Sequence, residues 1–243
     1  MRIMGVVSYK GFNYSGWQRQ KNDPSIQGEI EKVLSQILNQ PINIVGSGRT
    51  DAKVSALKQY FHFDVDKDVD LNRLLYSSNC LLPSDIYIQN LSEVDQNFHA
   101  RYDVKKKIYT YYLYLGHRNP FLDQHMTNIK EDMSIELFKN ALLSFVGQHN
   151  FQNFTSKEVD ENNFIREIYD INFVMPEKNI IKITFIGNGF MRYQIRNMVG
   201  TSIQVGLNKI PLSYINDLLD MEKRNITPYK CDGVGLYLTD VIY

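Results

Sequence analysis

Hydrophobic and polar positions alternate along several short segments of the chain, as they do in half-buried β-strands. Over residues 60–65, the apolar side chains of Phe61, Phe63 and Val65 alternate with Tyr60, His62 and Asp64. This period of two predicts a strand with one face toward a core. We predict further strands over residues 3–9, 42–45, 86–91, 108–115, 167–174, 180–186 and 235–241.

Other segments carry apolar residues at helical spacing. One stripe comprises Ile26, Ile30, Val33, Leu34, Ile37 and Leu38, and we expect this helix to begin with Asp23 as N-cap and Pro24 in the first turn. A second helix is predicted over residues 135–146, capped by Ser134. Further helices are expected over residues 71–79, 193–205 and 213–222.

Strands and helices are mixed in both halves of the chain, which favours an α+β fold over a parallel βαβ arrangement. No repeat, low-complexity tract or proline-rich linker separates the halves. We therefore predict two packed α+β lobes, residues 1–103 and 104–243, each a mainly antiparallel sheet with helices on one face. A central cleft is expected between them.

The charge balance gives no general reason to expect a polyanionic partner. Lys and Arg total 27, as do Asp and Glu, so any RNA-binding surface must be a local patch. The 16 Tyr and 13 Phe are more informative, because aromatic faces commonly hold unpaired bases, although most of these rings should belong to the core.

Metal, redox and membrane functions find little support. Cys80 and Cys231 lie far apart, and the five histidines occur singly, so we expect buried structural thiols and no metal site. No apolar stretch is long enough to cross a bilayer, and the first residues lack a signal-peptide pattern. The expected location is the cytoplasm.

The sharpest local pattern is Gly48-Arg49-Thr50-Asp51-Ala52, where a carboxylate and a guanidinium lie two residues apart on a glycine-flanked turn. On spacing alone, a surface turn with an ordinary ion pair explains it better than a catalytic site does.

This turn resembles the nucleophile motif of the tRNA pseudouridine synthase A family, and other segments agree with that family in the same order. The resemblance spans nearly the whole chain. The matching segments are residues 9–20 (YKGFNYSGWQRQ), 25–31 (SIQGEIE), 98–101 (FHAR), the strand at Tyr109, 189–200 (GFMRYQIRNMVG) and 235–238 (GLYL).

The resemblance implies isomerisation of uridine to pseudouridine in RNA without a cofactor. The leading candidate for the substrate is the anticodon stem-loop of tRNA. Such an enzyme must extrude the base, and Asp51 matches the family's catalytic aspartate, which attacks either the base or the sugar. A buried carboxylate needs a nearby cation to remain ionised, and Arg49 and Arg196 match family arginines. The family also implies a homodimer.

By resemblance alone, Tyr109 matches the tyrosine that stacks on the target base and assists proton transfer. Six basic side chains are expected to make further contacts to RNA. An equally good interpretation is that they are ordinary solvated residues of the surface. These are Arg19, Arg101, Lys105, Lys106, Lys107 and Arg192.

The chain departs from the family pattern after the aspartate. Lys53 stands where the family usually has glycine, and Ser55 where it usually has histidine. If the glycine position has positive φ, lysine costs about 1 kcal/mol there. Modification of ribosomal RNA by a specialised paralogue therefore stays open. A non-catalytic RNA-binding module is a second alternative that stays open. A glycosidase is the weakest alternative, because no motif in this chain supplies the second acid that such an enzyme needs beside Asp51.

Overall fold

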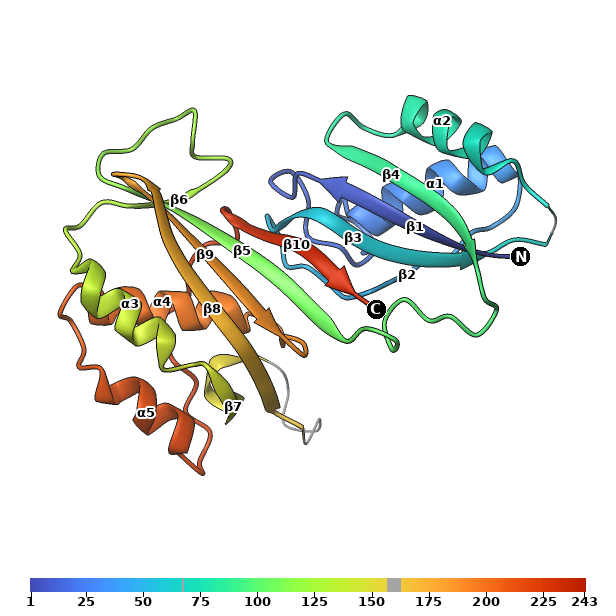
Figure 1. Cartoon of the computed structure of the whole chain (residues 1–243). Coiled ribbons are helices and arrows are strands. Elements are labelled where there is room, and N and C mark those ends of the chain that lie inside the picture. Colours follow the sequence, from blue (N-terminus) through green and yellow to red (C-terminus); the bar gives the residue numbers. More distant parts are fainter. Residues whose placement is uncertain (67, 157–162) are drawn as a thin grey trace. The chain divides into compact units, whose positions relative to one another are not determined.

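The computed structural model describes residues 1–66, 68–156 and 163–243, and the chain divides into two compact units (Figure 1). The first unit comprises residues 1–105 together with 237–243, and the second comprises residues 106–236. The last residues of the chain, which the sequence alone groups with the C-terminal half, thus belong to the first unit.

The first unit is built on a mainly antiparallel sheet. Its strands are β1 (Arg2–Tyr9), β2 (Val45–Gly46), β3 (Ser55–Asp64), β4 (Ile86–Val94) and β10 (Leu236–Ile242). β1 pairs antiparallel with β3 and β4, and β2 pairs antiparallel with β3. β10 runs parallel to β3, with Tyr237 opposite Ser55. The strand order in this unit is therefore β4-β1-β3-β10.

One face of this sheet is buried, since alternate residues of β1, including Ile3, Val7 and Tyr9, are almost inaccessible. The unit's helices are α1 (Ile26–Leu38) and α2 (Leu71–Leu81), and both bury apolar side chains. α1 is capped by Ser25, whose hydroxyl accepts a hydrogen bond of 3.4 Å from the N–H of Gly28. The predicted N-cap, Asp23, is wrong, because the side chain that accepts from an N–H of the first turn is that of Ser25.

The strands of the second unit are also mainly antiparallel. Its strands are β5 (Lys106–Leu115), β6 (Thr127–Ile129), β7 (Gly147–Asn150), β8 (Ile165–Glu177) and β9 (Ile180–Gly187). The antiparallel order is β5-β9-β8-β7, while β6 runs parallel to β5. In β9 the buried residues alternate along the strand, so here too one face of the sheet meets a core.

The helices of the second unit lie on one side of its sheet in Figure 1. They are α3 (Ile135–Leu143), the short 3₁₀ helix η1 (Gln152–Phe154), α4 (Gln194–Gly206) and α5 (Ser213–Asp220). Ser134 caps α3 by accepting from the N–H of Leu137, as predicted. The rings of Phe145 and Phe154 pack edge to face at 4.9 Å in the core.

The α+β prediction is confirmed in both units, and the predicted helices and most predicted strands have counterparts in the structure. The strand predicted over residues 42–45 is wrong for its first three residues, because only Val45 lies in a strand, β2. The strands β6 and β7 and the helix η1 were not anticipated. Cys231 is buried as expected, whereas the prediction for Cys80 is wrong because that side chain is exposed.

Within the described ranges, no helix is both long and apolar enough to cross a membrane. In the same part of the chain, no three His, Cys, Asp or Glu side chains lie close enough together to hold a metal ion.

Candidate active site

Asp51 lies on the turn of residues 47–54 between β2 and β3, and one side of this turn is fixed by Gln59. The side-chain amide of Gln59 donates to the carbonyl of Gly48 at 2.7 Å and its oxygen accepts from the hydroxyl of Ser47 at 2.9 Å. The side chains of Gln59 and Ser47 are both inaccessible to solvent. Since these bonds are shielded from water, they hold the start of the turn firmly.

The loop of residues 11–17 supports the other side of the turn. The N–H of Trp17 donates to the carbonyl of Thr50 at 3.1 Å, and the N–H of Lys53 donates to the carbonyl of Tyr14 at 3.3 Å. The hydroxyls of Tyr9 and Thr50 share a buried hydrogen bond of 2.8 Å. The backbone on both sides of Asp51 is therefore tied to β1 and to the loop that follows it.

Glycine is needed where this loop meets the turn. Gly16 has φ of 100°, and a Cβ there would lie 2.6 Å from the carbonyl oxygen of Thr50 and 3.1 Å from the carbonyl carbon of Asp51. A Cβ on Gly11 would lie 2.1 Å from the carbonyl oxygen of Val54. Only residues without a side chain let the two segments approach this closely.

Both departures from the family pattern have a structural counterpart. Lys53 has φ of 66°, the left-handed conformation that glycine adopts without cost, so the condition under which lysine is strained at this position is met. Its ammonium lies 5.9 Å from the centre of the Phe12 ring. Ser55 is buried, and its hydroxyl accepts a hydrogen bond of 3.0 Å from the N–H of Gly11. Serine thus has a specific task at this position, which is to anchor the loop.

The turn presents charge of both signs toward solvent. Asp51 is half-buried, while Arg49 and Lys53 are exposed. A carboxylate on a turn held this firmly is placed to serve as a nucleophile.

Arg196 belongs to the second unit, on the first turn of α4. Its Nε donates to the carbonyl of Cys231 at 2.9 Å, and the N–H of Cys231 donates to the carbonyl of Arg196 at 3.0 Å. Its guanidinium carbon also lies 4.9 Å from the centre of the Tyr193 ring. These contacts orient the guanidinium, while the side chain as a whole remains half-buried.

Tyr109 also belongs to the second unit, in β5 opposite Phe185 of β9. Its ring meets Phe190 edge to face at 5.4 Å, and the side chain is buried. Phe190 precedes α4 in the segment that the resemblance identifies. The ring of Tyr109 is therefore held in place by aromatic packing.

The remaining basic side chains named from the sequence differ in their surroundings. Arg19 forms an ion pair of 2.9 Å with Glu31, which is almost fully buried. Arg101 lies over the exposed Tyr102, and Lys106 lies 5.3 Å from the ring of Tyr169. Lys105 is exposed, Lys107 is half-buried, and Arg192 is exposed beside Tyr193. Of these six side chains, Arg192 lies near Arg196, because both contact the ring of Tyr193.

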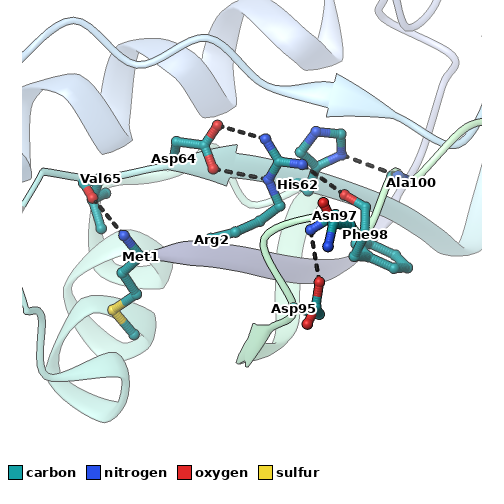
Figure 2. A network of polar contacts seen from close by, with 9 residues as sticks. All are labelled: Met1, Arg2, His62, Asp64, Val65, Asp95, Asn97, Phe98 and Ala100. Carbon is teal, nitrogen blue, oxygen red and sulfur yellow. Dashed lines mark hydrogen bonds and ion pairs between the residues drawn. The ribbon is translucent and has the colours of Figure 1, made fainter.

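A polar network fixes the segment that leads to Arg101 (Figure 2). The Nδ1 of His62 accepts from the N–H of Ala100 at 3.1 Å, and Arg2 donates to the carbonyl of Phe98 while pairing with Asp64. Burial is the main cause that lowers the pKa of His62 to about 4, so its ring is neutral at physiological pH. The hydrogen bond from Arg2 lowers the pKa of Asp64.

Several residues that shape these regions were not found from the sequence. Tyr9 and Gly16 lie inside a matched segment, so the resemblance marks the segment without assigning them a task. Tyr193 stands between Arg192 and Arg196, and its ring contacts both cations. Lys230 gave no local signal, although its ammonium lies 4.3 Å from the same ring.

Comparison with known proteins reveals close relatives. A family model described as tRNA pseudouridine synthase matches residues 141–243. Proteins named tRNA pseudouridine synthase A are similar over the full length of this chain. That of Streptococcus uberis is 35% identical, covering 100% of this chain and 98% of the relative. That of Lactococcus lactis subsp. cremoris is 37% identical, covering 100% and 97%.

Among solved structures, an H/ACA RNP bound to a substrate RNA containing 2′-deoxyuridine matches with a TM-score of 0.39 and 13% identity. That match covers 83% of this chain and 44% of the other.

Proposed function

The chain belongs to the tRNA pseudouridine synthase A family, and we propose that it isomerises uridine to pseudouridine in tRNA with Asp51 as the nucleophile. The observation that carries this function is the similarity to curated relatives over the whole chain. The rigid turn that holds Asp51 supports the choice of nucleophile, because its backbone is tied on both sides.

The proposed reaction breaks the bond from N1 of uracil to C1′ of the ribose and forms a bond from C5 to C1′. N1 gains a proton and C5 loses one, so the reaction is an isomerisation that needs no co-reactant. The carboxylate of Asp51 attacks either the base or the sugar and is released at the end. The base must leave its stack before the attack.

We assign the neighbouring roles as follows. Arg49 and Arg196 keep the carboxylate ionised when the bound RNA displaces water, and Tyr109 stacks on the target base and assists the proton transfer from C5. The packing of Tyr109 against Phe190 and the bond from Arg196 to Cys231 support these roles, because both side chains are already oriented.

The substrate site within the RNA is proposed to be the anticodon stem-loop. Arg19, Arg101, Lys105, Lys106, Lys107 and Arg192 are proposed contacts to the RNA backbone. Because the charge balance of the whole chain is zero, such contacts must come from local groups like these.

The test is to incubate the purified protein with unmodified bulk tRNA and, separately, with ribosomal RNA, and to map pseudouridine in both. We expect product in the anticodon arm of tRNA, and none with Asp51→Asn. Asp66→Asn, which neutralises an exposed aspartate of the same unit, is the matched control and should keep full activity.

Other results would change the assignment. Product in ribosomal RNA alone would keep the reaction and overturn the substrate. Tight RNA binding without any product from the wild type would instead indicate a non-catalytic binding module. Product from Asp51→Asn at the wild-type rate would remove Asp51 from the mechanism.

We also propose that the protein acts in the cytoplasm as a homodimer. Light scattering coupled to size-exclusion chromatography at micromolar concentration should give twice the 28.4 kDa mass of the chain. A monomer at every concentration tested would contradict the dimer.

A further inference from the structure

Three cationic side chains surround the ring of Tyr193 in the second unit. The guanidinium carbons of Arg192 and Arg196 each lie 4.9 Å from the ring centre, and the ammonium of Lys230 lies 4.3 Å from it. All three distances are within the range of cation–π attraction. The Nη2 of Arg192 also donates to the Tyr193 hydroxyl at 3.2 Å.

The backbone brings these side chains together from separate segments. Tyr193 adopts φ of 64° directly before α4, a conformation that costs about 1 kcal/mol for a residue other than glycine. The segment that carries Lys230 lies against α4, because a Cβ on Gly200 would be only 2.9 Å from the N–H nitrogen of Lys230. The hydrogen bonds between Arg196 and Cys231 fix this approach.

Two of the three cations carry a charge that no described carboxylate offsets. In the part of the chain that the structure describes, neither Arg192 nor Lys230 forms an ion pair, and both are exposed. The first turn of α4 has no acidic residue and no side-chain cap, so the positive end of the helix dipole adds to the same field. The aromatic ring offsets only part of the repulsion, and an anion would offset more.

The geometry favours a phosphate over a base as the group that binds here. Cations within 5 Å of the ring occupy space that a base stacked on Tyr193 would need. Guanidinium and ammonium groups are the common donors to phosphate oxygens.

We propose that the cluster of Arg192, Tyr193 and Lys230 binds a phosphate of the RNA backbone, with Tyr193 holding the two exposed cations in position. This inference rests on the proposed function, because that function supplies the RNA. It adds Tyr193 and Lys230 to the RNA-contacting residues. It also gives Arg192 a specific ligand group, the phosphate.

The experiment measures the affinity of the full chain for unmodified tRNA over a series of salt concentrations. The variants are Arg192→Gln, Lys230→Gln and Tyr193→Leu, with Lys223→Gln as the control for loss of an exposed positive charge elsewhere in the same unit. Each lost phosphate contact should reduce the slope of log affinity against log salt by about 0.7–0.9.

We expect that reduction for Lys230→Gln and Arg192→Gln, and an unchanged slope for Lys223→Gln. Tyr193→Leu, which keeps both charges and removes the ring, should weaken binding as the two cations lose their fixed position. Slopes that stay at the wild-type value in both charge variants would overturn the proposal, as would an equal reduction in Lys223→Gln.

Pseudouridine formation by the same samples separates this proposal from the proposed function. Normal product from the wild type with unchanged slopes in the variants would overturn the phosphate site and leave the proposed catalytic function intact. Reduced slopes together with a wild type that makes no pseudouridine would support the phosphate site and remove the catalytic function.

Discussion

The hydroxyl of Tyr9, at the end of β1, shares a buried hydrogen bond of 2.8 Å with the hydroxyl of Thr50, the residue before Asp51. This bond links β1, an inner strand of the first unit, to the turn that carries the proposed nucleophile.

Tyr9→Phe should therefore affect both stability and turnover. A buried Thr50 hydroxyl without its partner costs on the order of 1–2 kcal/mol in unfolding free energy. Turnover at saturating tRNA should fall roughly tenfold, because the turn is held less firmly, while the affinity for tRNA stays the same. Denaturant unfolding and single-turnover kinetics measure the two effects.

Tyr14→Phe is the matched control, since it removes the hydrogen bond of 2.7 Å from Tyr14 to Asp85. It should cost similar stability without slowing the reaction. An equal loss of rate in both variants would show that the hydroxyl pair of Tyr9 and Thr50 has no special part in positioning Asp51.

Gly16 should not tolerate alanine. With φ of 100° and the carbonyl oxygen of Thr50 2.6 Å from the new Cβ, Gly16→Ala must displace the turn. Gly116 has nearly the same φ, 104°, but a Cβ there meets nothing within 4 Å. Gly16→Ala should therefore unfold more easily than Gly116→Ala by about 1–3 kcal/mol, and only Gly16→Ala should lose activity. Equal stability in the two variants would mean that the steric contact with the turn is relieved at no cost.

Lys53→Gly should stabilise the protein by about 1 kcal/mol, because glycine adopts φ of 66° without strain. Lys53→Ala removes the same charge and the contact with Phe12 but keeps the strained backbone, so it should give no such gain. Chemical denaturation of the two variants measures the difference. If alanine stabilises as much as glycine, charge is the cause and backbone conformation is not.

His62 should make stability depend on pH. Its pKa is lowered from the usual 6.5 to about 4 in the folded state, so between these values the unfolded chain binds a proton that the folded chain does not. The unfolding free energy should therefore fall as the pH drops from 6.5 toward 4, by on the order of 2–3 kcal/mol.

His62→Asn offers an oxygen in place of Nδ1 to accept from Ala100 but cannot titrate in this range. Relative to this variant, the wild type should lose stability on acidification, and the NMR titration of His62 should report a pKa near 4. Parallel stability curves for the two proteins, or a ring that titrates above pH 6, would contradict the assignment.

The sequence by itself determined the local elements of this protein. The strand of residues 60–65 and the cap at Ser134 follow from side-chain alternation and from a hydroxyl three residues before a helical N–H. Such signals lie within a few residues of each other. The positive φ of Lys53 could only be stated as a condition, because the resemblance gave glycine as the usual residue there but not its backbone conformation. The helix start at Ser25 was missed, since Asp23 and Pro24 carry an equally good local signal.

Only the tertiary structure decided which distant segments meet. The pairing of Tyr237 with Ser55, the support of the Asp51 turn by Gly16, and the approach of Lys230 to Tyr193 have no signal in the nearby sequence. Each depends on how strands pair and on where a missing Cβ lets two backbones come close. These contacts gain their free energy from packing between residues far apart in the chain, and for that reason the pattern of one segment does not predict them.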